Sequence, residues 1–218
     1  MKVIISCLKV QKYVRNYKNE CYMSAKNSNT TSDYIEWDAA INLIHKLYRD
    51  GDFRMSLLVG CGIFFGTRIS DTLQLTWAML LDEDRFELIE KKTKKRREIK
   101  INNGFQKHIK DCFKALNITD KSEHCFISRK KTVFSTQRIN VLLKQMKKKY
   151  ALKSVKNLST HSLRKTFGRH IYECANENGE MALVMLSELF NHSNISITKR
   201  YLGLRREEIL RCYDLLDF

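Results

Sequence analysis

Apolar residues recur at helical spacing over most of the chain. A period of about 3.6 residues runs from Trp37 to Tyr48 and ends at Gly51, and a second apolar run covers 53–65. After an interruption at Gly66 and Thr67, a helical pattern restarts over 68–75. Beyond residue 102 the pattern predicts further helices near 103–116, 135–150, 160–176, 180–190, 194–202 and 206–216. We therefore expect a mainly helical protein.

Between Trp77 and Ile101 the pattern changes to short stretches of the kind that form strands. These are 77–81, 85–90 and 98–101, and a run rich in Lys and Arg connects the last two. They predict a small three-stranded antiparallel sheet. The expected fold class is therefore mainly α (α+β), and the lack of a repeat of fixed period argues against a solenoid.

The first part of the chain has weaker periodicity and ends in the polar stretch 26–31, which is typical of a linker. We expect an N-terminal segment and linker over 1–31 and one folded domain over 32–218. With 218 residues, 43% of them hydrophobic, the chain can bury a core but leaves little room for two full domains.

Charge points to the class of partner. Lys and Arg number 40 against 24 Asp and Glu, which gives a net charge of +16. Such a charge attracts polyanions, so nucleic acid is the leading candidate partner and a small-molecule substrate is not expected. No apolar run approaches the roughly 18 residues that a membrane-spanning helix needs, and the first ten residues lack the features of a signal peptide. We expect no membrane association.

Cysteine and histidine usage gives no indication of a metal or a disulfide framework. The seven cysteines are scattered, odd in number and without a CxxC pair, which is typical of reduced thiols in the cytoplasm. No His and Cys spacing fits a zinc site. The sequence therefore predicts a cytoplasmic protein without a structural metal.

Three motifs carry candidate chemistry. His161 and Arg164 lie three residues apart near the start of a predicted helix, an end that favours bound phosphate. Upstream, Gly-Thr-Arg-Ile-Ser-Asp contains Arg68, and downstream Leu-Phe-Asn-His-Ser-Asn contains His192, which Tyr201 follows nine residues later. Taken alone, the pair of His161 and Arg164 is more typical of a basic surface turn, and Tyr201 is more typical of a packed core residue. Their order and spacing are what carry information.

In that order the motifs resemble the tyrosine recombinases and integrases, whose catalytic domain carries Arg, Lys, His-x-x-Arg, His or Trp, and then Tyr. The resemblance covers about 32–218 and implies the helical catalytic domain of that family. Asn191 stands where the family's Leu-Gly-His motif has glycine. The catalytic residues that the resemblance implies are Arg68, Lys92, His161, Arg164, His192 and Tyr201, with Asp71 in a supporting role.

The lysine is the least defined member of this set. The turn over 91–97 offers four lysines, and Lys92 is our choice because its Lys-Thr step resembles the commonest form of the family's motif. A basic cluster of this kind is also a natural contact for the DNA backbone. We expect DNA contacts from Lys94, Lys95, Arg96, Lys165 and Arg200. The basic residues of the helix near 135–150, which include Arg138, Lys144, Lys147, Lys148 and Lys149, form either a solvated face or a further DNA contact.

The resemblance implies a division of roles that suits phosphodiester chemistry. Guanidinium groups of Arg68 and Arg164 would hold the phosphate, and the Tyr201 hydroxyl would attack it. His161 would act as base, Lys92 would protonate the leaving 5′ oxygen, and His192 would donate a hydrogen bond to the phosphate. The 3′-phosphotyrosyl product stores the bond energy, so no cofactor or metal is implied.

Some choices stay open at the level of sequence. Asp71 would orient His161, brace the arginine helix, or form a helix salt bridge. The apolar stripe of the C-terminal helix, 206–218, would dock on a neighbouring protomer of a homo-oligomer, such as a tetrameric synapse, or pack on its own domain. The short stretch before residue 32 leaves no full core-binding domain, as in a fragment or in short single-domain members of the family.

The expected function is site-specific DNA recombination, in integration, excision or inversion. A type IB topoisomerase shares the chemistry but relaxes DNA without exchanging strands. A non-catalytic DNA-binding regulator would use the same basic surface, and the intact set of six residues argues against it.

Overall fold

The computed structural model describes residues 31–214 and residue 216. The expected N-terminal segment, apart from Thr31, lies outside the described residues. The helices are α2 (Trp37–Arg49), α3 (Phe53–Phe65), α4 (Ile69–Thr72), α5 (Trp77–Leu81), α6 (Asn103–Ala115), α7 (Thr136–Lys149), α8 (Thr160–Cys174), η1 (Asn176–Asn178), α9 (Gly179–Phe190), α10 (Ile195–Leu202) and α11 (Leu204–Tyr213). Strands β1 (Arg85–Ile89) and β2 (Arg96–Lys100) form one hairpin. The prediction of a mainly helical fold is confirmed.

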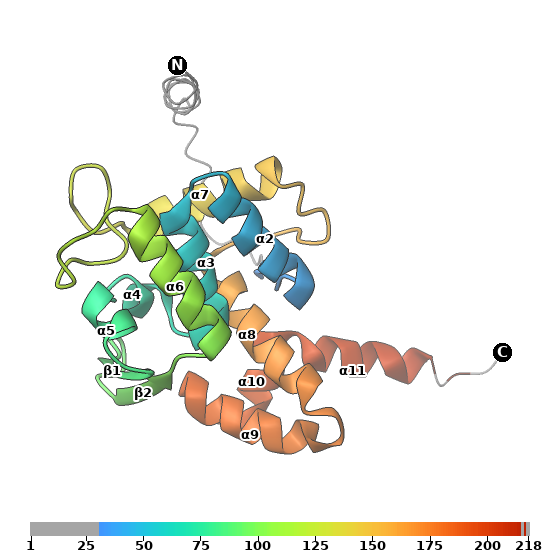
Figure 1. Ribbon diagram of the computed structural model, residues 1–218. Helices are drawn as coiled ribbons and strands as arrows, with labels where there is room; N and C mark the ends of the chain where they lie inside the picture. Colours follow the sequence, from blue (N-terminus) through green and yellow to red (C-terminus); the bar gives the residue numbers. More distant parts are fainter. Residues whose placement is uncertain (1–30, 215, 217–218) are drawn as a thin grey trace.

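Helix α3 forms the centre of the main core. It is apolar almost all round and, apart from half-buried Phe64, buried from Met55 to Phe65, with α2, α6 and α8 packed against it (Figure 1). Gly62 allows α8 to come close, because a Cβ at this position would lie 2.7 Å from Leu163. Since Leu163 lies between His161 and Arg164 in α8, this close packing positions both of those residues relative to α3.

The expected first strand, 77–81, is wrong: these residues form α5. The Thr76 side chain caps this helix by accepting a hydrogen bond from the Met79 amide over 3.4 Å. Trp77 and Leu80, three residues apart, both point into the core. A short apolar run fits a buried helix turn and a buried strand equally well, and here the N-cap decides for the helix.

The sheet among the described residues therefore has two strands and not three. Strands β1 and β2 pair antiparallel, with Arg85 opposite Lys100 and Ile89 opposite Arg96. Phe86, Leu88 and Ile99 face the core, so the alternation in the sequence fixes which face of the hairpin is buried. The turn between the strands carries the cluster of lysines.

The C-terminal helices build a second, smaller core. Leu183, Leu186 and Phe190 of α9 pack against Leu202 and Leu204. Helix α11 then projects away from the body of the molecule (Figure 1). Its apolar stripe is exposed, with 52% of Ile209, 53% of Leu210, 68% of Tyr213 and, beyond the helix, 73% of Leu216 accessible to solvent. The stripe is not packed on its own domain in this structure.

Within the described part of the chain, every helix is too short or too polar to cross a membrane. The same part contains no cluster of three or more His, Cys, Asp or Glu side chains that could bind a metal ion.

Candidate active site

Two arginines from distant segments meet at one backbone carbonyl. Arg68 is the N-cap of α4 and follows Gly66, whose left-handed backbone (φ 57°) ends α3. Its Nη2 donates to the Phe190 carbonyl over 3.2 Å, and Nη2 of Arg164 donates to the same oxygen over 3.0 Å. Arg68 lies 122 residues before Phe190 in the chain and Arg164 lies 26 residues before it. The fold thereby brings both side chains together at the C-terminus of α9.

Arg164 is a buried cation, only 4% exposed, with an incompletely satisfied guanidinium group. Its carbon Cζ lies 4.4 Å from the centre of the Phe190 ring, and its Nη1 has no hydrogen-bond partner among the described residues. Burial lowers the pKa of Arg164 to about 10. A buried donor without a partner is costly unless a ligand satisfies it, and a cationic donor of this kind favours an anion.

Tyr201 of α10 lies against this arginine pair. Its hydroxyl donates to the backbone carbonyl of His161 over 3.5 Å, and its ring lies 5.4 Å from the His192 ring, centroid to centroid. Burial raises the pKa of Tyr201 to about 12, although the charges of Arg164 and Arg68 act in the opposite direction. The hydroxyl therefore carries its proton in the free protein.

His192 is fixed by its own backbone and by a threonine. Asn191 ends α9 with left-handed geometry (φ 55°), a conformation that Asn tolerates, and so takes the place of the glycine expected there. The amide of His192 donates to the Ser187 carbonyl over 2.9 Å, and its Nδ1 lies 2.9 Å from the hydroxyl oxygen of buried Thr198. If this hydroxyl donates to Nδ1, the hydrogen of the ring sits on Nε2, ready for a ligand.

Both histidines of the set are biased toward the neutral form. Burial, reinforced by the charges of Arg164 and Arg68, lowers the pKa of His192. The pKa of His161 is lowered by burial and then by neighbouring cations, among them Arg164, Lys165 and Lys92. A neutral imidazole can accept a proton, so His161 has the protonation state that a base requires.

Asp71 ties α4 to the lysine turn. Its Oδ1 accepts a hydrogen bond from the Lys91 amide over 2.9 Å and another from the Ser70 hydroxyl over 3.3 Å. Asp71 is fully buried, and neither of these two hydrogen bonds involves His161. Of the roles expected for Asp71, this geometry fits bracing of the arginine helix, with the hairpin as the element that it braces against.

The lysines of the turn lie in different surroundings. Lys95 donates from Nζ to the Asn191 side chain over 2.8 Å and so links the hairpin to the end of α9. Lys94 adopts left-handed geometry (φ 58°) and closes the turn. Lys92 is exposed, and its charge is one of the cations that lower the pKa of His161.

The residues expected to contact DNA fall into two groups. Arg96 and Arg200 are exposed, and Arg96 pairs with Glu87 over 3.1 Å at the surface. Lys165 is partly buried: its Nζ donates to the Ser32 carbonyl over 2.7 Å and lies 5.2 Å from the centre of the Tyr201 ring. Lys165 therefore lies beside the tyrosine ring and is not a fully exposed surface cation.

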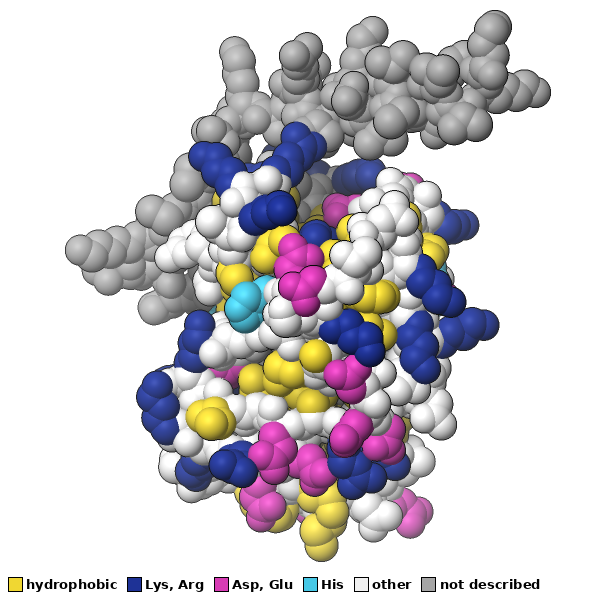
Figure 2. Space-filling model, turned by 60° about the vertical axis from the view of Figure 1, so that its left-hand side comes forward, with side chains coloured by type: hydrophobic (Ala, Val, Ile, Leu, Met, Phe, Trp, Pro, Cys, Tyr) yellow, Lys and Arg dark blue, Asp and Glu magenta, His cyan; other side chains and the backbone are white. Residues whose placement is uncertain are grey.

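Charge is unevenly distributed over the surface. On the face shown in Figure 2, Lys and Arg side chains lie mainly around the rim, whereas Asp and Glu side chains gather in its lower half. On α7, Arg138 is exposed and Lys149 pairs with Asp50, so part of the charge of this helix is engaged within the chain.

Two residues at the site were not singled out from the sequence. Glu90, 3% exposed, accepts hydrogen bonds from Arg68 Nη1 and from the Thr93 hydroxyl, each over 2.6 Å. Arg97 donates to the carbonyls of Phe65 over 2.7 Å and of Leu189 over 3.5 Å. In the sequence, Glu90 could have been noticed as an acidic residue directly before a run of basic residues. Nothing in the sequence distinguishes Arg97 from the other basic residues of that run.

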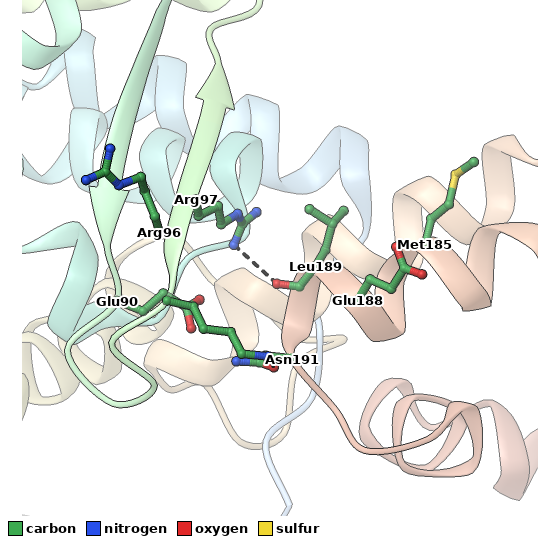
Figure 3. Close-up of a pocket in the computed structure, with 8 residues that line it drawn as sticks. Glu90, Arg96, Arg97, Met185, Glu188, Leu189 and Asn191 are labelled. Atoms are coloured by element: carbon green, nitrogen blue, oxygen red, sulfur yellow. Dashed lines mark hydrogen bonds between the residues drawn. The ribbon is translucent and has the colours of Figure 1, made fainter.

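A cavity of about 300 Å³ opens beside these residues, between the hairpin and α9 (Figure 3). Glu90 and Arg97 line it from the hairpin, and Met185, Leu189 and Asn191 line it from α9. It adjoins the arginine pair, because Arg97, Leu189 and Asn191 are all held close to Phe190.

Known proteins are similar to most of this chain. The family model described as "Phage integrase family" matches residues 26–208. The probable integrase/recombinase YoeC of Bacillus subtilis (strain 168) is 30% identical over 154 residues, which cover 70% of this chain and 78% of YoeC.

Solved structures share the fold at low sequence identity. The crystal structure of XerA recombinase superposes with a TM-score of 0.63 and 19% identity, over 88% of this chain and 68% of that one. The Tn1549 transposon integrase in complex with transposon right end DNA gives a TM-score of 0.64 and 14% identity, over 96% and 76% of the two chains. The lambda integrase catalytic core gives 0.53 and 14%, over 71% of this chain and 90% of that one.

Proposed function

The chain belongs to the phage integrase family, whose members are site-specific DNA recombinases, and from that premise we propose that it cleaves and rejoins DNA through a 3′-phosphotyrosyl intermediate on Tyr201. The observation that carries this proposal is the convergence of Arg68 and Arg164 on the Phe190 carbonyl, beside the Tyr201 ring. It supports a preformed site for a phosphodiester next to a candidate nucleophile.

The arginine pair supplies what a phosphodiester transition state needs. Negative charge builds up on the non-bridging oxygens during attack. Rigid guanidinium groups can donate bidentate hydrogen bonds to these oxygens. The shared carbonyl restrains both groups before DNA binds, so little reorganisation remains for the reaction itself. The unpartnered Nη1 of Arg164 and the Nε2 of His192 are the donors that the phosphate would satisfy.

Attack by Tyr201 requires removal of its proton. The pKa of the Tyr201 hydroxyl is about 12 in the protein without DNA. The proton therefore has to leave as the oxygen–phosphorus bond forms, and His161 is the base that we propose. The Tyr201 oxygen bonds to phosphorus, the bond to the 5′ oxygen breaks, and Lys92 protonates that oxygen. Religation runs the same steps in reverse with a 5′ hydroxyl as nucleophile, so the cycle balances without a cofactor.

The partners that we propose are double-stranded DNA and further copies of this chain, acting in the cytoplasm. The exposed stripe on α11 supports docking on a neighbouring protomer. Helix α9 offers a complementary face, since Met181 and Met185 are exposed and its sequence contains two Glu but no Lys or Arg. Helix α11 carries three Arg and two Glu, and both Glu are paired within the chain, with Arg169 and Lys199. Its Arg side chains therefore supply charge opposite to that of α9, in addition to the apolar surface.

A plasmid assay tests the proposed function. A supercoiled plasmid carrying two copies of the recombination site should yield exchanged circles or an inverted segment without added metal or nucleotide. Relaxed topoisomers without exchange would indicate a type IB topoisomerase activity. Retarded but chemically unchanged DNA would indicate a binding protein that does not cleave.

A further inference from the structure

Glu90 is a buried carboxylate at the base of the lysine turn, and the roles proposed above do not use it. Its Oε2 accepts one hydrogen bond from Arg68, which belongs to the phosphate site, and one from Thr93, which adjoins Lys92 in the turn. One oxygen atom thus connects the group that would bind the phosphate to the segment that would deliver the proton.

The backbone of Glu90 also closes the turn. Its amide donates to the Lys95 carbonyl over 3.0 Å, and its carbonyl accepts from the Lys94 amide over 2.9 Å. The turn over 91–94 is therefore held at its base by Glu90, while Asp71 holds its first amide, that of Lys91. These contacts fix the backbone on both sides of Lys92.

Glu90 is charged despite its burial. Burial raises its pKa, but hydrogen bonds from Thr93 and Arg68 outweigh that effect, and the pKa lies below the usual value. A buried carboxylate is stable only when it is paired, and the ion pair with Arg68 provides the pairing.

This negative charge weakens the attraction of Arg68 for a phosphate, so electrostatics alone would disfavour a carboxylate here. Its benefit must lie in geometry. Arg68 is restrained at Nη1 by Glu90 and at Nη2 by the Phe190 carbonyl, which together fix the plane of the guanidinium group. The remaining N–H groups then point in a defined direction.

We propose that Glu90 is a positioning residue that aligns Arg68 with the phosphate and, through Thr93, holds the turn so that Lys92 reaches the leaving 5′ oxygen. The proposal rests on the proposed function of the site. It predicts that loss of Glu90 harms proton delivery as well as phosphate binding, because misplacement of a reacting group by about 1 Å can cost about a hundredfold in rate.

The test compares two leaving groups. Single-turnover cleavage is measured on nicked DNA carrying the site at which the wild-type protein forms its adduct, with either oxygen or sulfur at the bridging 5′ position. Sulfur departs without protonation, so the ratio of the two rates reports proton delivery. Glu90→Ala should lower the rate on the oxygen substrate by about tenfold or more and raise the sulfur-to-oxygen ratio by at least about tenfold.

Conservative variants and a matched control sharpen the result. Glu90→Gln keeps the acceptor for Thr93 and should shift the ratio less than Glu90→Ala does. Thr93→Val leaves the Arg68–Glu90 pair in place and should raise the ratio as well, which keeps the proposal testable if Glu90→Ala does not fold. Glu87→Ala removes an exposed carboxylate from β1, three residues before Glu90, one that pairs with Arg96, and should leave the ratio unchanged.

An unchanged ratio in the folded Glu90→Ala protein, or in Thr93→Val if Glu90→Ala does not fold, would overturn the proposal, whatever the size of the rate loss. If the wild-type protein forms no adduct on any DNA, the proposed function itself fails. These two failures are therefore distinguishable in one experiment.

Discussion

Arg68 and Arg164, 96 residues apart in the chain, donate hydrogen bonds to the same oxygen atom, the carbonyl of Phe190. This carbonyl lies at the C-terminus of α9, where unsatisfied carbonyls carry partial negative charge. It therefore holds two cations side by side that would otherwise repel each other. The left-handed turn at Asn191 then directs the chain toward His192, so one helix end organises three members of the candidate site.

The shared carbonyl predicts that lysine cannot replace Arg164. A lysine has a single ammonium group and cannot bond the Phe190 carbonyl and a phosphate in fixed directions at once. Arg164→Lys should lower the single-turnover cleavage rate by about a hundredfold or more, with a much smaller effect on DNA affinity. Arg96→Lys, at an exposed position on the hairpin, is the matched control and should cleave at nearly the wild-type rate. Equal rates for Arg164→Lys and the control would contradict the assignment.

The lowered pKa of His161 predicts the shape of the pH profile. A base must be neutral, and the pKa of His161 lies below its usual 6.5, so the base form is complete at neutral pH. Cleavage should therefore stay constant between about pH 7 and pH 9 and fall in acid as His161 becomes protonated. His161→Gln should lose this acid limb. If instead the wild-type rate rose about tenfold per pH unit between pH 7 and 9, the tyrosine would ionise without this base.

The exposed stripe on α11 predicts a separation of assembly from chemistry. Leu210→Glu places a charge on a side chain that is 53% exposed, so the fold and single-site cleavage should not change. The complex containing two DNA sites should be lost, since the apolar contact with the neighbouring protomer can no longer form. His45→Glu, at an exposed position on α2 outside the proposed contact, controls for the added charge. Sedimentation of the protein on two-site DNA measures the outcome, and an unchanged two-site complex in Leu210→Glu would rule out docking through this stripe.

The assignment of Lys92 predicts rescue by a better leaving group. Lys92→Ala should cleave normal DNA slowly, by about a hundredfold or more, and recover on DNA with sulfur at the bridging 5′ position. Lys95→Ala is the natural comparison, because Lys95 is engaged by Asn191 and should show no such rescue. If the sulfur substrate rescued the Lys94 or Lys95 variant and not the Lys92 variant, the proton donor would be Lys94 or Lys95 in place of Lys92.

The sequence was informative where local patterns decide the structure. The helical period and the polar start of α8 were sufficient to put His161 and Arg164 on one helix, and alternation was sufficient to find both strands of the hairpin. The same reasoning failed at Trp77–Leu81, where a short apolar run has no period of its own and the Thr76 cap decides. Local patterns therefore locate long elements better than single turns.

Tertiary contacts could not be predicted from the sequence. The pair of Arg68 and Glu90 joins residues 22 positions apart, and the bonds from Arg97 to Phe65 and Leu189 end on backbone carbonyls that carry no sequence signal. For the same reason, the sequence could not decide whether the apolar stripe of α11 is exposed or packed on its own domain, because an apolar face alone does not reveal what covers it. The motif order gave the identity of the candidate residues, and only the fold gave the contacts that restrain them.

The central claim is that Tyr201 is the nucleophile, and trapping the covalent complex tests it most directly. On a nicked substrate whose short 5′ product diffuses away, the wild-type protein should become linked to a 3′ phosphate without added metal or nucleotide, and the linked peptide should contain Tyr201. Tyr201→Phe should bind the same DNA with similar affinity and form no adduct. An adduct that persists in Tyr201→Phe, or that maps to Tyr172 or Tyr213, would contradict the account.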